Sequence, residues 1–402
     1  MTEWKTYRLG NVCKKVCSGG TPKSTEPSYY DGDIPWLNTK EINFNRIYST
    51  ERSITQKGLD NSSAKWIDAN CVIVAMYGAT AAKVAINKIP LTTNQACCNL
   101  SIDEKIADYH YVYYWLCANY TELASLANGG AQQNLNAQQI KDFEISLPSL
   151  EEQRRIAGIL GAIDDKIENN RRINTNLELQ AQALYKQWFV DFEFPNEEGK
   201  PYKSSGGKMV DSALGLIPES WSVGALSDLA DITMGQSPNG KSFNENGEGI
   251  VFYQGRTEFG IRYPSIRLYT TEPTRYAEPM SVLLSVRAPV GDINIATQKC
   301  CIGRGVASIK SKTADNAYMY CCLKELRPQL DQYNGEGTVF GSINRKELEG
   351  LALCIPKNEV ISQFNNLVLG MDRQMLNLFQ QTQNLATLRD ALLPKLMNGE
   401  IK

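Results

Sequence analysis

The sequence contains one histidine, no Cys-x-x-Cys pair and no apolar run long enough to span a membrane. His110 lies in the aromatic stretch ADYHYVYYWL (107–116), which is typical of a buried helix, so we expect it to be structural. A lone buried histidine excludes most histidine-based metal and acid–base chemistry, including a Ser-His-Asp set. The sequence does not open with a basic-then-apolar leader, which favours a cytoplasmic protein without membrane contact.

Cysteine is present, but not in a pattern that holds a fold together. The sequence has eleven cysteines, and six of them form three adjacent pairs, Cys97-Cys98, Cys300-Cys301 and Cys321-Cys322. Neighbouring residues on a strand point to opposite faces, which suits neither a disulfide framework nor a metal site. These cysteines are therefore predicted to be small buried hydrophobes in a reducing compartment.

Charge of one sign is also lacking, because the formal net charge is −2 over 402 residues. A nucleic-acid partner would need a local positive surface, or one supplied by partner subunits. The length exceeds what a single hydrophobic core usually organises, so two or more domains are expected.

The most informative feature is an internal repeat. Trp4, Leu9 and Thr21-Pro22 recur as Trp221, Leu226 and Ser237-Pro238. Four longer segments recur in the same order: IPWLNTKEI (34–42) as IVFYQGRTEF (250–259), TAAKVAI (80–86) as PVGDINI (289–295), NQACCNL (94–100) as GRGVASI (303–309), and LNAQQIKDFEISLP (135–148) as INRKELEGLALCIP (343–356). The two halves are therefore expected to share one fold.

Each half ends in a long segment whose apolar residues alternate at four-three spacing, the pattern of a heptad seam. The predicted seam residues are Ile156, Leu160, Ile163, Ile167, Leu177, Leu184 and Trp188 in the first half, and Phe364, Val368, Met371, Met375, Leu385, Leu392 and Leu396 in the second. Asn170, Asn174 and Thr382 interrupt the seam. They either form a water-facing stretch or fix the register between the helices.

These patterns predict an α+β protein with an internal pseudo-twofold repeat. Two similar α/β domains, 1–148 and 221–357, are separated by two long antiparallel helices, 149–192 and 358–402, that form a coiled coil. The segment 193–220 is rich in Gly, Ser, Pro and charge and is expected to be a linker.

The stretch GQSPNGKS (235–242) matches the P-loop pattern letter for letter. A P-loop needs a helix that starts at Lys-Ser, but FNENGEGIVFYQG follows, which is a poor helix former. The equivalent stretch in the first half, SGGTPKSTEP (18–27), lacks the second glycine. A nucleoside triphosphatase is therefore disfavoured.

The whole chain resembles the specificity (S) subunit of type I restriction–modification enzymes. The motifs that carry the resemblance are WSVGALSDLADITMGQSP (221–238), YQGR (253–256), SVRAPVG (285–291), GRGVASI (303–309), EEQRRIAGILGAIDDKIENNRRI (151–173) and LRDALLPKLMNGEI (388–401). Their order and duplication make the resemblance specific.

The resemblance implies that each globular domain is a target-recognition domain for one half of a bipartite DNA sequence. It implies that the helices space the half-sites and dock two methyltransferase subunits, and that restriction subunits complete the complex. S-adenosylmethionine, ATP and magnesium are then expected in the partners, with no cofactor, metal or catalytic residue in this chain. A methylation-only system and a two-headed protein-binding adaptor remain as alternatives.

DNA-contacting residues are predicted in the loops at matched repeat positions, where Arg, Asn and Gln can reach base edges and other donors can reach phosphates. The alternative for each is a polar residue that stabilises its loop. Arg256, Arg287 and Arg304 are the strongest candidates. The full set is Thr21, Lys23, Asn38, Lys40, Tyr77, Thr80, Asn94, Gln95, Gln132, Gln133 and Asn134 in the first half, and Gln236, Ser237, Lys241, Gln254, Arg256, Arg287, Arg304, Ser342 and Asn344 in the second.

Overall fold

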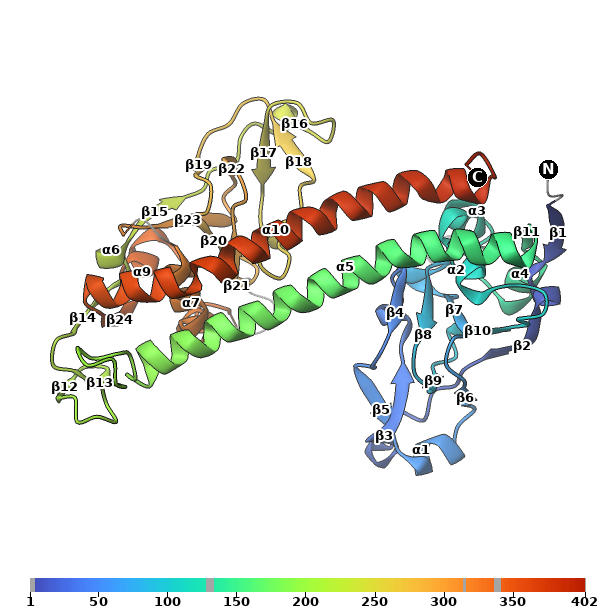
Figure 1. Ribbon diagram of the computed structural model, residues 1–402, viewed down its shortest axis with the longest axis horizontal. Coiled ribbons are helices and arrows are strands. Elements are labelled where there is room, and N and C mark those ends of the chain that lie inside the picture. The colour runs from blue at the N-terminus through green and yellow to red at the C-terminus, as the bar shows by residue number, and fades with distance from the viewer. Residues whose placement is uncertain (1–3, 128–133, 314–315, 336–340, 402) are drawn as a thin grey trace. The chain divides into compact units, whose positions relative to one another are not determined.

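The computed structural model describes residues 4–127, 134–313, 316–335 and 341–401 (Figure 1). Its chain divides into two compact units, one made of Met1–Glu168 with Gln383–Lys402 and the other of Asn169–Thr382. Each unit combines one globular domain with one segment of each of two long helices, α5 (Leu150–Tyr185) and α10 (Asn358–Met397).

The domain of the first unit is built on two mixed sheets. The larger has the strand order β2-β10-β7-β8-β4, the smaller has the order β5-β3-β9-β6, and β1 pairs with β11. β7 carries the apolar run VIVA and is buried along its whole length, which explains its central position. The strands are β1 (Lys5–Arg8), β2 (Cys13–Ser18), β3 (Tyr30–Leu37), β4 (Asn45–Ile47), β5 (Arg52–Ile54), β6 (Trp66–Ile67), β7 (Val72–Ala75), β8 (Val84–Asn87), β9 (Leu91–Thr93), β10 (Cys97–Ile102) and β11 (Glu144–Leu147), and the short helices are α1 (Gln56–Asp60), α2 (Tyr109–Ala118), α3 (Tyr120–Ser125) and α4 (Ala137–Asp142).

The domain of the second unit has a four-stranded sheet, β15-β23-β20-β21, and a five-stranded sheet, β16-β18-β17-β22-β19. Two further pairs are β12-β13 and β14-β24. The strands are β12 (Met209–Ser212), β13 (Gly215–Pro218), β14 (Ser222–Ala225), β15 (Ala230–Met234), β16 (Phe243–Asn244), β17 (Ile250–Tyr253), β18 (Leu268–Thr270), β19 (Tyr276–Ala277), β20 (Val282–Val286), β21 (Val290–Ile295), β22 (Cys300–Ile302), β23 (Val306–Ser311) and β24 (Ala352–Ile355), and the helices are α6 (Leu226–Leu229), α7 (Ala317–Glu325), α8 (Arg327–Asp331) and α9 (Arg345–Glu349).

The two domains share one topology, which confirms the repeat read from the sequence. The order β2-β10-β7-β8 corresponds to β15-β23-β20-β21. The parallel pair β3-β9 corresponds to the parallel pair β17-β22, and β1-β11 corresponds to β14-β24. The predicted mixed α/β fold with two similar domains is therefore correct.

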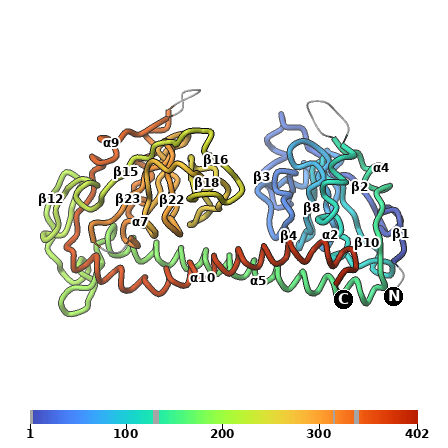
Figure 2. Tube along the Cα trace, turned by 90° about the horizontal axis from the view of Figure 1, so that it is seen from above, coloured from blue at the N-terminus to red at the C-terminus, as the bar shows by residue number. Residues whose placement is uncertain are grey.

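Within the second unit, the segments of α5 and α10 run antiparallel and side by side (Figure 2). Trp188 packs against Phe364 with ring centroids 5.9 Å apart, while Asn174 Nδ2 lies 3.3 Å from the carbonyl oxygen of Met375. In the first unit, Ile156 and Leu160 of α5 share one buried cluster with Leu396 of α10. All the predicted seam residues are buried or half-buried.

The polar seam positions are not water-facing. Asn170 is fully buried and donates from Nδ2 to Gln381 Oε1 at 2.8 Å, and Thr382 is 8% exposed. A buried amide with one directional partner favours one register over others. The observed burial therefore supports the register interpretation.

The segment expected as a linker has structure of its own. It contains the β12-β13 hairpin, and Phe194 stacks on Trp221 and on Tyr202 with ring centroids 5.1 and 4.7 Å apart. Aromatic residues among its glycines and serines thus attach it to the core of the second unit.

Candidate nucleic-acid interface

The loop 235–242 forms no phosphate-binding helix. Gly240–Ser242 is a single 3-10 turn, capped by the Asn239 side chain, which accepts from the amide of Lys241. Ser242 is 8% exposed, and its hydroxyl lies 2.8 Å from that of Thr270. The loop therefore has neither the helix that follows a P-loop nor the free serine hydroxyl that a P-loop needs.

A glycine at an equivalent place in each unit brings two loops into close contact. A Cβ on Gly235 would lie 2.2 Å from the carbonyl oxygen of Gly303, and one on Gly19 would lie 2.0 Å from that of Thr93. Only glycine permits such an approach. The Pro-containing turn after each glycine therefore sits beside the loop that follows β9 or β22.

This contact places predicted site residues next to each other in both units. The Thr21 hydroxyl donates to the side-chain carbonyl of Gln95. At the equivalent place, the Ser237 hydroxyl accepts from the backbone amide of Arg304 at 3.3 Å. Gln95 and Arg304 are exposed, so each loop presents a side chain suited to hydrogen bonding with base edges.

A second matched pair lies where the chain leaves β7 in the first unit and β20 in the second. Isolated antiparallel bridges join Tyr77 to Asn134 and Arg287 to Ser342. All four residues are exposed. Each unit thus carries two pairs of predicted site residues at corresponding positions.

The other candidates are placed less uniformly. Asn94 is 8% exposed and its side-chain oxygen accepts from the amide of Ala96 at 3.1 Å, so it holds its own loop. Asn38 and Asn344 cap short helical turns. Lys23, Lys40, Gln236, Lys241, Gln254 and Arg256 are exposed and Thr80 is half-buried, while Gln132 and Gln133 lie outside the described residues.

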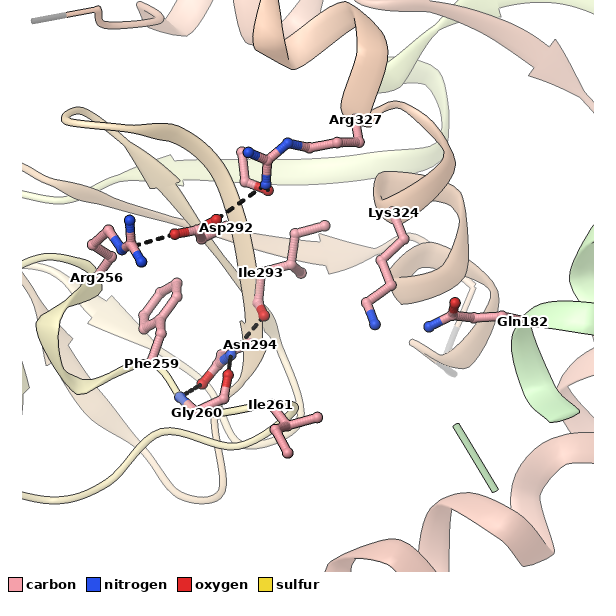
Figure 3. A pocket seen from close by; sticks show the side chains of 11 residues that line it. Gln182, Arg256, Phe259, Gly260, Ile261, Asp292, Ile293, Asn294, Lys324 and Arg327 are labelled. Atoms are coloured by element: carbon pink, nitrogen blue, oxygen red, sulfur yellow. Dashed lines mark hydrogen bonds and ion pairs between the residues drawn. The ribbon is translucent and has the colours of Figure 1, made fainter. Parts of the chain in front are cut away.

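Arg256 lines a pocket of about 470 Å³ in the second unit (Figure 3). Asp292 lies on one wall between Arg256 and Arg327, and Lys324 and Gln182 lie opposite. Asp292 Oδ2 is 2.8 Å from Arg256 Nε, and Asp292 Oδ1 is 3.0 Å from Arg327 Nη1.

The first unit has the opposite charge at the equivalent position. The recurrence of TAAKVAI as PVGDINI aligns Lys83 with Asp292, and Lys83 Nζ donates to Asn43 Oδ1 at 2.8 Å. The sequence analysis missed Asp292 and Arg327 as site residues. The signal was available in part, since the aligned segments reverse charge at this position.

A buried arginine links each domain to its helices. In the second unit Arg262 pairs with Glu178 of α5 and with Asp372 of α10, the latter at 2.6 Å, and Lys324 Nζ lies 2.6 Å from Glu178. Burial alone would raise the pKa of the Glu178 carboxyl, but Arg262 and Lys324 outweigh it and hold that pKa below its ordinary value. In the first unit Arg46 pairs with Asp165 and Glu168 of α5.

Burial holds several titratable groups in their neutral form. Burial and the charge of Lys88 lower the pKa of His110 to about 4, so the imidazole is neutral at pH 7. Burial raises the pKa of Cys98 and of Cys300 to about 12, which keeps both thiols protonated.

Across the described ranges, no group of three or more His, Cys, Asp or Glu residues is placed to hold a metal ion. None of the described helices is both long and apolar enough to cross a membrane.

Known proteins match both halves of the chain. Residues 1–179 and 218–380 match the family described as the type I restriction modification DNA specificity domain. The type I restriction enzyme MjaIX specificity subunit of Methanocaldococcus jannaschii is 28% identical over 100% of this chain and 97% of that relative. A putative type I restriction enzyme MjaX specificity subunit of the same organism is 40% identical over 57% of this chain, and the match spans about half, 52%, of that relative.

A solved structure shares the fold. The crystal structure of a type I restriction–modification system S subunit from M. genitalium matches 98% of this chain and 96% of its own, with a TM-score of 0.60 and 18% sequence identity. The likeness therefore extends to both units.

Proposed function

This chain belongs to the type I restriction modification DNA specificity family, and on that premise we propose that it is the DNA sequence-specificity subunit of a type I restriction–modification complex. In this proposal, the domain of each unit reads one half of a bipartite DNA target. The helices α5 and α10 set the spacing between the half-sites and dock two methyltransferase subunits.

The observation that carries the proposal is the duplication of polar residue pairs in the loops of a duplicated fold. Thr21 with Gln95 and Tyr77 with Asn134 recur as Ser237 with Arg304 and Arg287 with Ser342. The scaffold is kept while the side chains differ, as expected of two readers of different sequences.

The chemistry is assigned to the partners. Adenine methylation would use S-adenosylmethionine on the methyltransferase subunits, and ATP and magnesium would serve restriction subunits that translocate and cleave DNA. This chain would recognise DNA without catalysing a reaction, in the cytoplasm. A methylation-only complex would use this chain in the same way.

Selection from a randomised DNA duplex library tests the proposal, with this chain bound to its methyltransferase partner. A bipartite motif with a fixed gap is expected, with affinity falling steeply as salt rises. Selection of no motif at any salt concentration would refute it and favour the protein-binding adaptor.

A further inference from the structure

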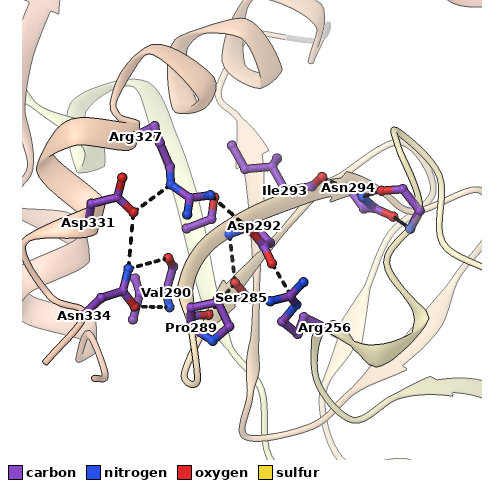
Figure 4. A network of polar contacts seen from close by, with 12 residues as sticks. Arg256, Ser285, Pro289, Val290, Asp292, Ile293, Asn294, Arg327, Asp331 and Asn334 are labelled. Atoms are coloured by element: carbon purple, nitrogen blue, oxygen red, sulfur yellow. Dashed lines mark hydrogen bonds and ion pairs between the residues drawn. The ribbon is translucent and has the colours of Figure 1, made fainter. Parts of the chain in front are cut away.

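Asp292 stands between two arginines at the edge of the candidate interface (Figure 4). Its two carboxylate oxygens are divided between them, with 2.8 Å to Arg256 Nε and 3.0 Å to Arg327 Nη1. Arg327 is held in turn by Asp331, whose Oδ1 accepts from Arg327 Nε at 2.7 Å. One carboxylate thus connects an exposed loop arginine to helix α8.

The position of this carboxylate is fixed by the backbone around it. The buried hydroxyl of Ser285 accepts from the amide of Asp292 at 2.9 Å and donates to the carbonyl oxygen of Pro289 at 2.9 Å. Asn334 brackets Val290, accepting from its amide at 2.7 Å and donating to its carbonyl oxygen at 3.1 Å. The backbone of Asp292 is therefore held in place, and its carboxylate is an anchor beside Arg256.

The Asp292 carboxylate pairs with the Nε edge of the Arg256 guanidinium and leaves the edge formed by Nη1 and Nη2 available. Only Nε pairs with Asp292, and within the part of the chain that the structure describes, the terminal nitrogens Nη1 and Nη2 have no acceptor. The side chain is 51% exposed. Two terminal N–H groups in a fixed fork match the O6 and N7 acceptors of guanine.

The carboxylate also selects the kind of acceptor that Arg256 meets. A negative group 2.8 Å from Nε partly neutralises the guanidinium and repels a phosphate approaching the same side chain. A neutral base edge carries no such penalty. Holding the side chain in place beforehand also reduces the conformational entropy lost on binding.

The first unit lacks this arrangement. Lys83 occupies the position of Asp292, and Lys40 occupies that of Arg256, so two cations stand where the second unit has a paired anion and cation. A lysine is a point charge without a planar fork. The arrangement therefore concerns one half-site only.

We propose that Asp292 is a positioning residue that aims the Arg256 fork at a guanine in the half-site read by the second unit. This inference rests on the proposed DNA-recognition function and goes beyond it by naming the base and the residue that directs the contact.

Selection from a randomised duplex library, with the chain bound to its methyltransferase partner, tests this proposal in wild type, Asp292→Asn and Arg256→Ala. Wild type is expected to require a guanine at one position of the second half-site. Both variants should lose that preference by about tenfold, the discrimination of one bidentate contact. Asp292→Asn should also bind unrelated DNA more tightly, and the salt dependence of its affinity should correspond to about one more released counterion.

Two controls separate positioning from folding. Glu278→Gln removes a carboxylate that is paired with Lys299 elsewhere in the second unit, and should leave the motif unchanged. The first half-site should stay the same in every variant. If Asp292→Asn does not fold, Asp292→Glu decides, because it keeps the negative charge and shifts the carboxylate by one methylene group: a weaker guanine preference supports the proposal and an unchanged one overturns it.

The outcomes distinguish the two claims. A wild-type chain that selects no bipartite motif contradicts the proposed function. A wild-type chain that selects one, with Asp292→Asn selecting the same bases at the same strength, overturns only the role of Asp292.

Discussion

The two units share a fold but differ in the chemistry they expose. Glycine approaches, central sheets and bridged loop pairs recur in both units, whereas the polar side chains at matched positions change from Tyr77, Gln95 and Lys83 to Arg287, Arg304 and Asp292. The scaffold is held by buried packing that tolerates little change, while the loops can vary without unfolding it. The proposed function therefore assigns specificity to a few side chains on a duplicated frame.

The largest expected difference between the units concerns their buried arginines. Arg262→Ala should lower the free energy of unfolding of the second unit by about 3–5 kcal/mol, because it leaves Glu178 and Asp372 buried without their guanidinium. Arg46→Ala should cost the first unit about 1 kcal/mol, since the Asp165 side chain is 69% exposed and remains hydrated. Urea unfolding with hydrogen exchange to assign each unit measures both, and equal losses would contradict this account.

The glycines shared by both units give the next effect. Gly235→Ala should destabilise the second unit by about 1–3 kcal/mol through a clash with the carbonyl oxygen of Gly303. Gly19→Ala should act similarly in the first unit. Gly240→Ala is the matched control, because its Cβ would meet nothing within 4 Å. Thermal unfolding of the three variants compares them, and a Gly240→Ala loss as large as that of Gly235→Ala would refute the packing argument.

A substitution at Arg287 tests whether the two units contact different half-sites of the DNA. Arg287→Ala should weaken binding to the second half-site by about tenfold and leave binding to the first half-site unchanged, since it removes one bidentate contact. Tyr77→Ala, at the equivalent position, should affect only the first half-site. Binding to duplexes with one half-site scrambled measures each effect, and a target profile identical to wild type at wild-type affinity would count against Arg287 as a contact.

Lys241 tests the loop that matches a P-loop. Lys241→Ala should reduce the salt dependence of DNA binding by about one ion without changing the motif, as expected for a phosphate contact. Nucleotide binding by the wild-type chain, lost in Lys241→Ala, would contradict the structural account of this loop.

A pH-dependent effect is specific to the first unit, which holds the single histidine. Because the pKa of folded His110 is about 4 and that of an unfolded histidine is about 6.5, the unfolded chain takes up the proton first. The contribution of neutral His110 is therefore complete above pH 6.5 and is lost as the pH falls toward 4. Urea unfolding of wild type and His110→Phe at pH 7 and pH 5 measures this effect. The free energy of unfolding should fall less between the two pH values in the variant than in wild type. An identical fall would show that His110 does not contribute to the pH dependence.

The sequence predicted the frame well because the frame repeats. Runs such as VIVA and matched segments such as NQACCNL and GRGVASI specify strands through local pattern alone. The hairpin at Met209–Pro218 was not predicted, and the sequence left open whether Asn170 is buried, because both depend on what packs against these residues. The link from Arg256 through Asp292 to Arg327 joins three separate segments, so no spacing rule along the chain could identify it.

The central claim is that two similar domains read two different halves of one DNA target. Mapping methylated adenines in cells that carry this chain with its methyltransferase partner tests it most directly. The account predicts one bipartite motif, with two dissimilar half-sites and a gap of fixed length. An uninterrupted motif, or methylation that does not depend on this chain, would contradict it.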